Sequence, residues 1–176
     1  MSPMTEQDVY LGRDAGPPGL KRLASGKVRD IYELDDERLL FVTTDRVSAF
    51  DVVMNEGIPH KGRVLTAIST HWFGVTGDLI PNHLISTSVD DVPGLDDEWK
   101  AKLRGRIMIV HRCQPTAVEW VVRGYVVGSG WKEYQAKGTI SEIPQPAGLR
   151  QAERLPEADR CDECADSGTA VDTGNR

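Results

Sequence analysis

The stretch at residues 118–135, VEWVVRGYVVGSGWKEYQ, constrains the fold of this 176-residue chain more than any other. Its first half is apolar and β-branched, which predicts a buried strand. Gly-Ser-Gly at 128–130 follows the strand and favours the start of a helix over 130–137. Ser129 suits the N-cap of that helix and Gly138 suits its C-cap. A strand that runs directly into a helix N-terminus is therefore the first local structure that the sequence predicts.

Two charged residues, Glu119 and Arg123, interrupt the predicted strand. Because residues two apart in a strand share a face, both charges lie on one face, which we expect to border a polar cleft. The first N–H groups of the following helix have no internal partners and lie at the positive end of its dipole. Together with Arg123, Ser129 and Gly130, they predict a phosphate or carboxylate site. A salt bridge between Glu119 and Arg123 and an ordinary N-cap explain the same pattern equally well.

The remaining periodicities predict an α+β fold in which helices pack on an antiparallel sheet. Two strand-like runs, 20–34 and 38–44, flank a polar turn and predict a hairpin. Residues 63–76 change to helical spacing, and we expect their apolar stripe to pack on the sheet. The residues of this stripe are Leu65, Ile68, Trp72 and Val75. A short helix at 96–103 and a strand at 107–113 follow, and the irregular alternation of strands and helices favours α+β.

Composition divides the chain into three parts. Residues 1–19 are rich in Gly and Pro and are expected to form a flexible arm, and residues 20–156 form one folded portion. The sequence after Pro156 has six acidic residues, two basic residues, no aromatic residue and one branched aliphatic residue. Such a segment buries too little apolar surface to offset its ordering entropy. We therefore expect residues 157–176 to be a disordered acidic tail.

Charge and hydropathy argue against several classes of protein. The formal net charge of -6 and the sequence pI of about 5.2 disfavour a general nucleic-acid-binding surface. No apolar run is long enough to span a membrane, and the N-terminus lacks the features of a secretory signal, so a cytoplasmic protein is expected. Cys161 and Cys164 form one C-x-x-C without a second pair, which disfavours a zinc site. We expect them to be exposed thiols in the tail.

The segment SGKVRD is a second candidate anion site. Gly26 permits a tight turn between two strands, and Lys27 and Arg29 project from the second strand on one face, where they suit the oxygens of a triphosphate. The segment is not a Walker A loop, because Gly19 is too far upstream and Val28 stands where Ser or Thr is needed. A solvated hairpin is the alternative interpretation.

The segment TDRVSAFD at 44–51 is polar, but no spacing in it is typical of a catalytic constellation. Its polar residues include Asp45, Arg46, Ser48 and Asp51. A hydrogen-bonded turn explains this pattern best. Lys61 and Gly62, just before the predicted helix, form a further candidate anion site. The pattern alone assigns no role to these residues.

Five motifs occur in one order along the chain: GKVRDIYEL, TDRVSAFDV, PHKGRVLTAIS..WF, VEWVVRGYVVGSGWKEYQ and GLRQAERLPE. They cover about residues 20–157 and resemble the N-terminal portion of the SAICAR synthetase family (phosphoribosylaminoimidazole-succinocarboxamide synthase). The resemblance implies that the α+β portion is a SAICAR-synthetase-like nucleotide-binding lobe.

The resemblance also implies an ATP-dependent ligase of de novo purine biosynthesis. The family joins L-aspartate to the carboxylate of carboxyaminoimidazole ribonucleotide, using ATP and magnesium, to give SAICAR. The carboxylate is activated as an acyl phosphate and is then attacked by the aspartate amine. Such chemistry depends on positioning and charge neutralisation rather than on a covalent nucleophile.

Site residues follow from the motif positions. The residues that would line the phosphates of ATP are Gly26, Lys27 and Arg29. The residues of the hinge that would face adenine through its backbone are Arg112, Cys113 and Gln114. The residues that would contact the imidazole ribonucleotide are Arg123, Ser129 and Gly130. The resemblance assigns no catalytic residue and no metal ligand within this chain.

The chain departs from the family in length. Family members continue past the last motif with a second α+β portion that supplies magnesium-binding carboxylates, so we expect this chain to be truncated and to have little or no ligase activity. The acidic residues of 157–176 match no family motif. The alternative function is a non-catalytic nucleotide-binding or interaction module. The expected partners are small molecules (ATP, L-aspartate and carboxyaminoimidazole ribonucleotide), with no nucleic acid and no membrane.

Overall fold

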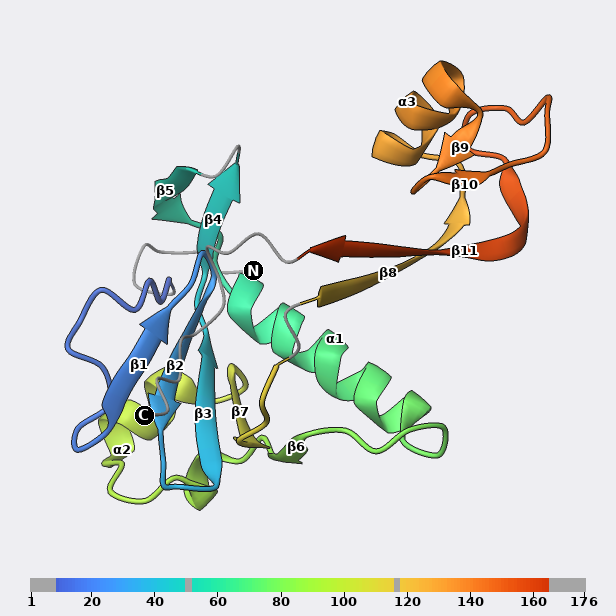
Figure 1. The fold of residues 1–176 in the computed structure, drawn as a ribbon. Coiled ribbons are helices and arrows are strands. Elements are labelled where there is room, and N and C mark those ends of the chain that lie inside the picture. Colours follow the sequence, from blue (N-terminus) through green and yellow to red (C-terminus); the bar gives the residue numbers. More distant parts are fainter. Residues whose placement is uncertain (1–8, 50–51, 116–117, 165–176) are drawn as a thin grey trace, which may run out of the picture. The chain divides into compact units, whose positions relative to one another are not determined.

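The computed structural model divides the chain into two compact units, Met1–Gln114 and Pro115–Arg176 (Figure 1). The structure describes residues 9–49, 52–115 and 118–164, with the backbone alone for 118–121 and 156–164. The sequence predicts one folded portion over 20–156, whereas the structure has a boundary at Pro115, directly after the predicted hinge. Each unit has its own hydrophobic core.

A five-stranded antiparallel sheet forms the first unit, in the order β1-β2-β3-β7-β6. Its strands are β1 (Lys21–Ser25), β2 (Arg29–Glu33), β3 (Arg38–Thr43), β7 (Ile107–His111) and β6 (Leu84–Ser86). The register places Tyr32 opposite Leu40, and Leu40 opposite Ile109. The predicted hairpin and the predicted strand at 107–113 are confirmed, as is the α+β fold class.

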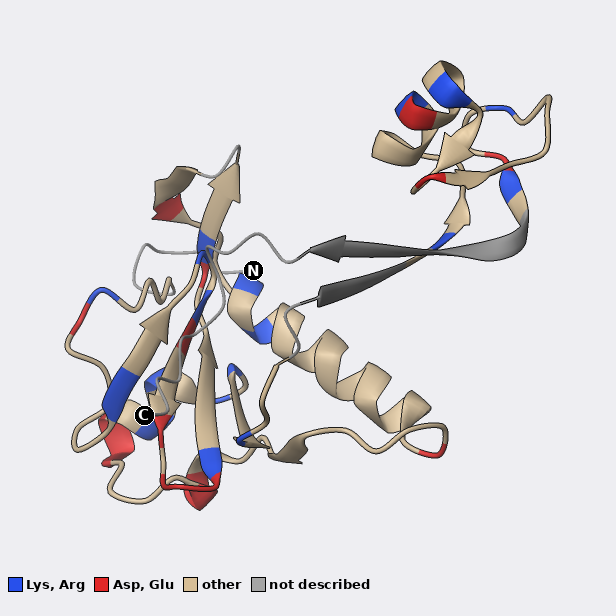
Figure 2. Ribbon diagram, in the orientation of Figure 1, with Lys and Arg blue, Asp and Glu red and all other residues tan. Residues whose placement is uncertain are grey.

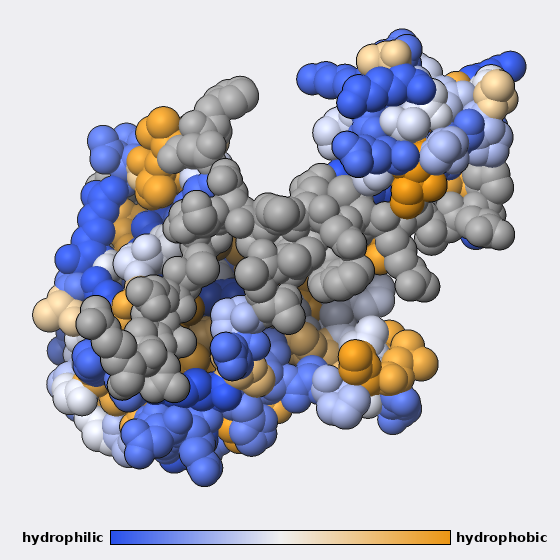
Figure 3. All heavy atoms as spheres, in the orientation of Figure 1, coloured by the Kyte–Doolittle hydropathy of each residue, from blue (hydrophilic) through white to orange (hydrophobic). Residues whose placement is uncertain are grey.

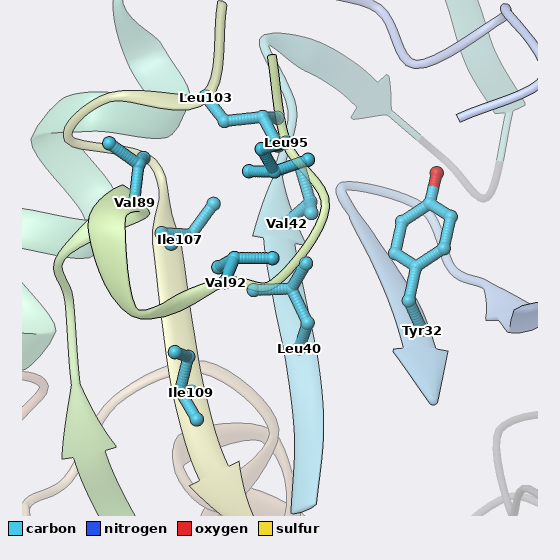
Figure 4. Close-up of a cluster of buried hydrophobic side chains, with 9 residues drawn as sticks. All are labelled: Tyr32, Leu40, Val42, Val89, Val92, Leu95, Leu103, Ile107 and Ile109. Atoms are coloured by element: carbon cyan, nitrogen blue, oxygen red, sulfur yellow. The ribbon is translucent and has the colours of Figure 1, made fainter. Parts of the chain in front are cut away.

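One face of this sheet carries the core of the first unit (Figure 4). Tyr32, Leu40 and Ile109 point to this face because alternate residues of a strand share a side, and all three are buried. The chain between β6 and β7 packs on them through the short 3-10 helix η2 (Val89–Asp91) and helix α2 (Asp97–Leu103). The Asp96 side chain caps α2 by accepting the N–H of Trp99 at 2.8 Å. The short helix predicted at 96–103 is thereby confirmed.

Helix α1 (Lys61–Thr76) matches the predicted helix, but it does not bury the predicted stripe. Its buried residues are Gly62 and Thr66, and a Cβ at Gly62 would overlap the carbonyl oxygen of Thr43. The side of the helix formed by Leu65, Ile68, Trp72 and Val75, here called the α1 stripe, is exposed. The expectation that these residues pack on the sheet is therefore wrong for this chain. Helical spacing shows which residues share a face, but not whether another element covers that face.

A two-stranded antiparallel ribbon joins β3 to α1. Its strands are β4 (Arg46–Ala49) and β5 (Val52–Gly57). The sequence predicts only a hydrogen-bonded turn over 44–51, because the charged residues of this segment hide the alternation of a strand. Arg46 is buried at the first position of β4, so a charged side chain occupies an inward-facing strand position.

The second unit contains two long antiparallel strands, β8 (Val118–Tyr125) and β11 (Arg154–Cys164). Between them lie helix α3 (Gly128–Lys137) and a short ribbon of β9 (Thr139–Ile140) and β10 (Ile143–Pro144). The residues of its small core are Val126, Ile140 and Leu155, with Trp131, Tyr134 and Leu149 packed against them. Gly138 ends α3 with a φ of 72°, as predicted for a C-cap.

Two details of the second unit differ from the sequence predictions. Val127 is the N-cap of α3 and makes no side-chain cap bond, so Ser129 lies in the first turn of the helix instead of capping it. The backbone of 157–164 belongs to β11, where Arg160 lies opposite Val122 in β8, whereas the sequence predicts disorder there. Composition shows how many apolar side chains a segment can bury, but it does not show the backbone hydrogen bonds that a neighbouring strand supplies. Residues 165–176 lie outside the described part of the chain.

Within the described ranges, no helix has the length and apolar character that crossing a membrane requires.

Candidate functional site

The turn between β1 and β2 carries the first group of candidate residues. Gly26 donates its N–H to the carbonyl oxygen of Arg29 at 2.8 Å, which closes the turn. A Cβ at Gly26 would lie only 3.3 Å from the same oxygen, so glycine fits this position with the least strain. Lys27 is exposed in the turn, and Arg29 is the first residue of β2. Two cationic side chains therefore lie within three residues of each other.

A buried ion pair between Asp30 and Arg46 lies against this turn. Arg46 Nη2 is 2.7 Å from Asp30 Oδ1, and the two side chains are 9% and 0% exposed. Ser25 donates its hydroxyl to the same carboxylate oxygen at 2.6 Å. No sequence motif indicates a role for Asp30, although its position on β2, two residues before the core residue Tyr32, places a carboxylate on the buried face. The pair joins the start of β4 to the turn.

A second buried ion pair joins Asp45 to Arg106. Asp45 Oδ1 is 3.1 Å from Arg106 Nη1 and accepts the N–H of Gly62 at 2.7 Å. Asp45 Oδ2 accepts the N–H of Tyr10 at 2.8 Å. The carboxylate thus ties the residue before β7, the first turn of α1 and the N-terminal segment together. Asp45 has a structural role, and Arg106 is a partner that the sequence analysis does not select.

Arg29 lies on the face of the sheet opposite the core. Its guanidinium lies 5.4 Å from the centre of the Phe41 ring, and burial lowers the pKa of Arg29 from its ordinary value. Its Nε is buried without a hydrogen-bond partner among the described residues. Removal from water disfavours an isolated cation, so a negatively charged oxygen near Arg29 would be bound favourably.

The predicted hinge lies after β7. Arg112 donates to the carbonyl oxygen of Asp35 at 3.2 Å, and its Nη2 is 3.1 Å from Glu33 Oε1. Cys113 is an exposed free thiol that lines an open cavity of about 650 Å³ together with His83. The other residues that line this cavity are Phe73, Thr76, Ile80, Pro81, Asn82 and His111. The hinge is thus adjacent to the C-terminal half of α1.

The turn and the hinge lie at opposite ends of the same strands. Arg29 begins β2, and Glu33, which contacts Arg112, ends it. Four residues of a strand span about 13 Å. Between them, on the face of Arg29, the register aligns Ile31 with Phe41 and Phe41 with Met108. An apolar row therefore separates two cations at the turn from the polar backbone at the hinge.

The candidate residues of the second unit lie together. Arg123 Nη2 donates to the hydroxyl oxygen of Ser129 at 3.3 Å. Gly130 is buried, and a Cβ there would lie 3.7 Å from Cδ of Arg123, so the Arg123 side chain runs along the first turn of α3. The Glu119 side chain, which the sequence places on the same face as Arg123, lies outside the described residues. The arginine is thus held at a helix N-terminus, where N–H groups lack helical partners.

The remaining polar residues of the motifs are Ser48, Lys61 and Asp51. Ser48 is half-buried in β4, Lys61 is the first residue of α1, and Asp51 lies outside the described residues. In the ranges that the structure describes, no three His, Cys, Asp or Glu side chains come close enough to hold a metal ion. Figure 2 marks the Asp and Glu positions along the described ribbon in red.

Comparison with known proteins gives one consistent result. A model of the SAICAR synthetase family matches residues 22–160. The phosphoribosylaminoimidazole-succinocarboxamide synthases of Geotalea uraniireducens and Pelobacter propionicus are 57% and 59% identical over 140 residues, which cover 80% of this chain and 47% of each relative. The solved SAICAR synthase of Saccharomyces cerevisiae, complexed with SAICAR, has a TM-score of 0.75 and 38% identity, and the match covers 86% of this chain and 53% of that one. The chain spans about half the length of the relatives that it matches, and it belongs to the SAICAR synthetase family.

Proposed function

We propose that this chain is the nucleotide-binding part of an ATP-dependent ligase that joins L-aspartate to carboxyaminoimidazole ribonucleotide to give SAICAR. The observation that carries the proposal is the family match over residues 22–160, which includes every candidate residue of the turn, the hinge and α3. The reaction is assigned to the complete family protein, of which this chain spans about half.

The proposed chemistry moves one phosphoryl group and forms one C–N bond. The γ-phosphoryl group of ATP passes to the carboxylate of the ribonucleotide, and ADP is released. The amine of aspartate then attacks the carbonyl carbon, loses a proton and displaces inorganic phosphate. Both steps place negative charge on phosphoryl oxygens, so the protein contributes mainly by holding cations and N–H donors in position.

The surroundings of the β1–β2 turn support ATP binding there. Lys27 and Arg29 would bind the phosphates, and the partly buried Arg29 gains most from an anionic partner. The apolar row of Ile31 and Phe41, both only partly buried, offers a surface for a base beside the hinge. The spacing of turn and hinge along β2 suits a nucleotide whose phosphates and base occupy opposite ends.

The first turn of α3 supports binding of a second anionic group. Arg123, Ser129 and the backbone of Gly130 combine a fixed charge, a hydroxyl and helix N-terminal N–H groups. These donors suit the phosphate or carboxylate of the imidazole ribonucleotide. The two groups of candidate residues belong to different units, and each is proposed as a separate subsite.

Magnesium does not fit the described residues, since they contain no cluster of three metal-ligating side chains. We propose that its ligands belong to the part of the family protein that this chain does not span. No step of the reaction is therefore assigned to a metal held by this chain.

Calorimetric titration of residues 1–176 with ATP, and separately with carboxyaminoimidazole ribonucleotide, tests the proposal. Lys27→Ala should weaken ATP binding by about tenfold or more, because a phosphate loses a charge-assisted partner. Arg123→Ala should weaken ribonucleotide binding and leave ATP binding unchanged. The reverse pattern would overturn the assignment of the two subsites.

A non-catalytic nucleotide-binding module is the second candidate function, and the location of both the turn and the hinge within the first unit favours it. The two functions predict different titrations. A ligase fragment should bind both ligands, whereas a nucleotide-binding module should bind ATP alone.

A further inference from the structure

Arg46 is nearly buried, and two of its side-chain hydrogen bonds go to one turn. It is 7% exposed, and it is the first residue of β4. Its Nη2 donates to the carbonyl oxygen of Gly26 at 2.9 Å, and its Nε donates to that of Lys27 at 3.4 Å. Both acceptors belong to the β1–β2 turn, which precedes Arg46 by about 20 residues. The contact therefore joins two segments that are distant in sequence.

Asp30 fixes the guanidinium in this position. Its two carboxylate oxygens accept from Nη2 at 2.7 Å and from Nη1 at 3.3 Å, which is the two-point contact that Arg makes best. Nη1 also donates to the carbonyl oxygen of Leu11 at 2.9 Å. With one side held by Asp30 and Leu11, the remaining donors of Arg46 have a fixed direction toward the turn.

The direction of the two turn carbonyls matters for anion binding. Carbonyl oxygens carry partial negative charge and repel a phosphate, whereas N–H groups attract it. Because the carbonyl oxygens of Gly26 and Lys27 accept from Arg46, they point into the protein and away from a ligand at the outer side of the turn. Loss of Arg46 would free these carbonyl groups to rotate.

We propose that Arg46, paired with Asp30, is a positioning residue that holds the β1–β2 turn in the shape that binds the phosphates of ATP. This inference rests on the proposed function of the turn. A buried ion pair adds little net stability compared with apolar residues of similar volume. The contribution of the pair is therefore the orientation of Gly26 and Lys27.

The test uses a variant that removes the pair without leaving a buried charge. Asp30→Leu combined with Arg46→Met keeps the side-chain volume and the net charge, so the first unit should still fold. Arg46→Lys keeps the charge but provides a single donor group in place of the fork. The matched control is Glu98→Gln combined with Lys102→Gln, which removes an exposed ion pair of 2.8 Å on α2. Lys27→Ala serves as the positive control.

Three readouts on the 176-residue chain separate positioning from general stability. Thermal unfolding checks that each variant is folded, hydrogen exchange reports the order of residues 25–29, and calorimetry with MgATP gives the affinity. The double apolar variant should keep its melting temperature within a few degrees, exchange the turn amides faster and bind MgATP about tenfold more weakly. Arg46→Lys should lie between this variant and the unaltered chain, and the α2 control should match the unaltered chain.

The outcomes distinguish this inference from the proposed function. If the unaltered chain does not bind MgATP, the nucleotide subsite itself is wrong and the inference falls with it. If the unaltered chain binds, Lys27→Ala weakens binding and the folded double apolar variant binds normally, only the positioning role of Arg46 is overturned. Slow exchange of residues 25–29 in the folded double variant would also overturn it.

Discussion

At the scale of single residues, buried charges organise the first unit. Asp45 accepts from Tyr10, Gly62 and Arg106, which come from three separate segments. We predict that Asp45→Asn lowers the free energy of unfolding of this unit by roughly 3–5 kcal/mol, because Arg106 keeps a buried charge without its partner. A urea titration in which hydrogen exchange of the β3 amides reports unfolding of this unit measures this change.

Asp36→Asn is the control for this prediction. Asp36 is exposed in the turn between β2 and β3, so its substitution should change stability by less than about 0.5 kcal/mol. An equal effect of the two substitutions would contradict a structural role for Asp45.

His83 gives a prediction about pH. Burial lowers the pKa of His83, and the nearby charges of Arg29 and His111 lower it further. The unfolded chain therefore binds a proton more readily than the folded chain below the ordinary value of 6.5. The contribution of His83 to stability is fully present above pH 6.5 and is lost as the pH falls from 6.5 toward the lowered pKa.

Substitution isolates this contribution. His83→Phe should flatten the loss of stability between pH 6.5 and the acid range, because the ring still packs against Phe73, whose centroid is 5.3 Å away. His71→Phe, at an exposed position of α1, is the matched control for the exchange of a histidine for a phenylalanine. Identical pH profiles for His83→Phe and the unaltered chain would exclude this role of His83.

The site could be predicted from sequence only where its residues are close along the chain. Lys27 and Arg29, or Arg123 and Ser129, fall within one motif, so their types and spacing predict an anion site. Asp30 and Arg46 lie 16 residues apart, and nothing local connects a carboxylate in β2 to an arginine in β4. Pairs of this kind become visible only when the register of the sheet is known.

At the scale of elements, α1 shows where sequence patterns stop being informative. The helical spacing of apolar residues predicts where α1 lies, but it does not predict which side of the helix is exposed. After Arg63 the helix has no Lys, Arg, Asp or Glu (Figure 2). Apolar residues gather at its C-terminal end and in the loop that follows, where Leu79 is 83% exposed (Figure 3). Contiguous apolar surface of this kind favours association.

We predict that the α1 stripe makes the chain self-associate. Burial of Ile68 and Trp72, now 50% and 57% exposed, would remove apolar area from water. The combined change Ile68→Gln and Trp72→Gln should weaken self-association by about tenfold or more. Sedimentation velocity over a range of concentrations measures it, with Ala67→Gln on the same helix as control. A chain that stays monomeric at every concentration would contradict the prediction.

Like the site residues, some strands can be predicted from local sequence and others cannot. Apolar, β-branched runs predict β2, β3, β7 and β8. By contrast, β4 has only four residues and begins with Arg46, and β11 is rich in charge, so neither strand is predicted. In β11 the backbone of residues 159–164 pairs with β8, so the strand depends on its partner and not on its own composition. Strands defined by their neighbours are not predictable from a single segment.

At the scale of the whole molecule, the division at Pro115 separates the two groups of candidate residues. The first unit holds the turn and the hinge, and the second holds Arg123 and the start of α3. The relatives are about twice as long as the matched region, and we expect the proposed reaction to need the portion that this chain does not span. Ligand binding and catalysis are therefore expected to separate in experiments on residues 1–176.

We predict that residues 1–176 bind ATP but form little or no SAICAR. Their described part has no cluster of metal-ligating side chains, and a bound divalent ion commonly supplies several kcal/mol of stabilisation to the transition state of phosphoryl transfer. An incomplete site also leaves the activated carboxylate open to water, which would hydrolyse it. The assay combines the chain with ATP, magnesium, aspartate and carboxyaminoimidazole ribonucleotide and measures succinocarboxamide, with the full-length Pelobacter propionicus relative as control. Turnover near that of the control would mean that this half of the family protein holds a complete active site.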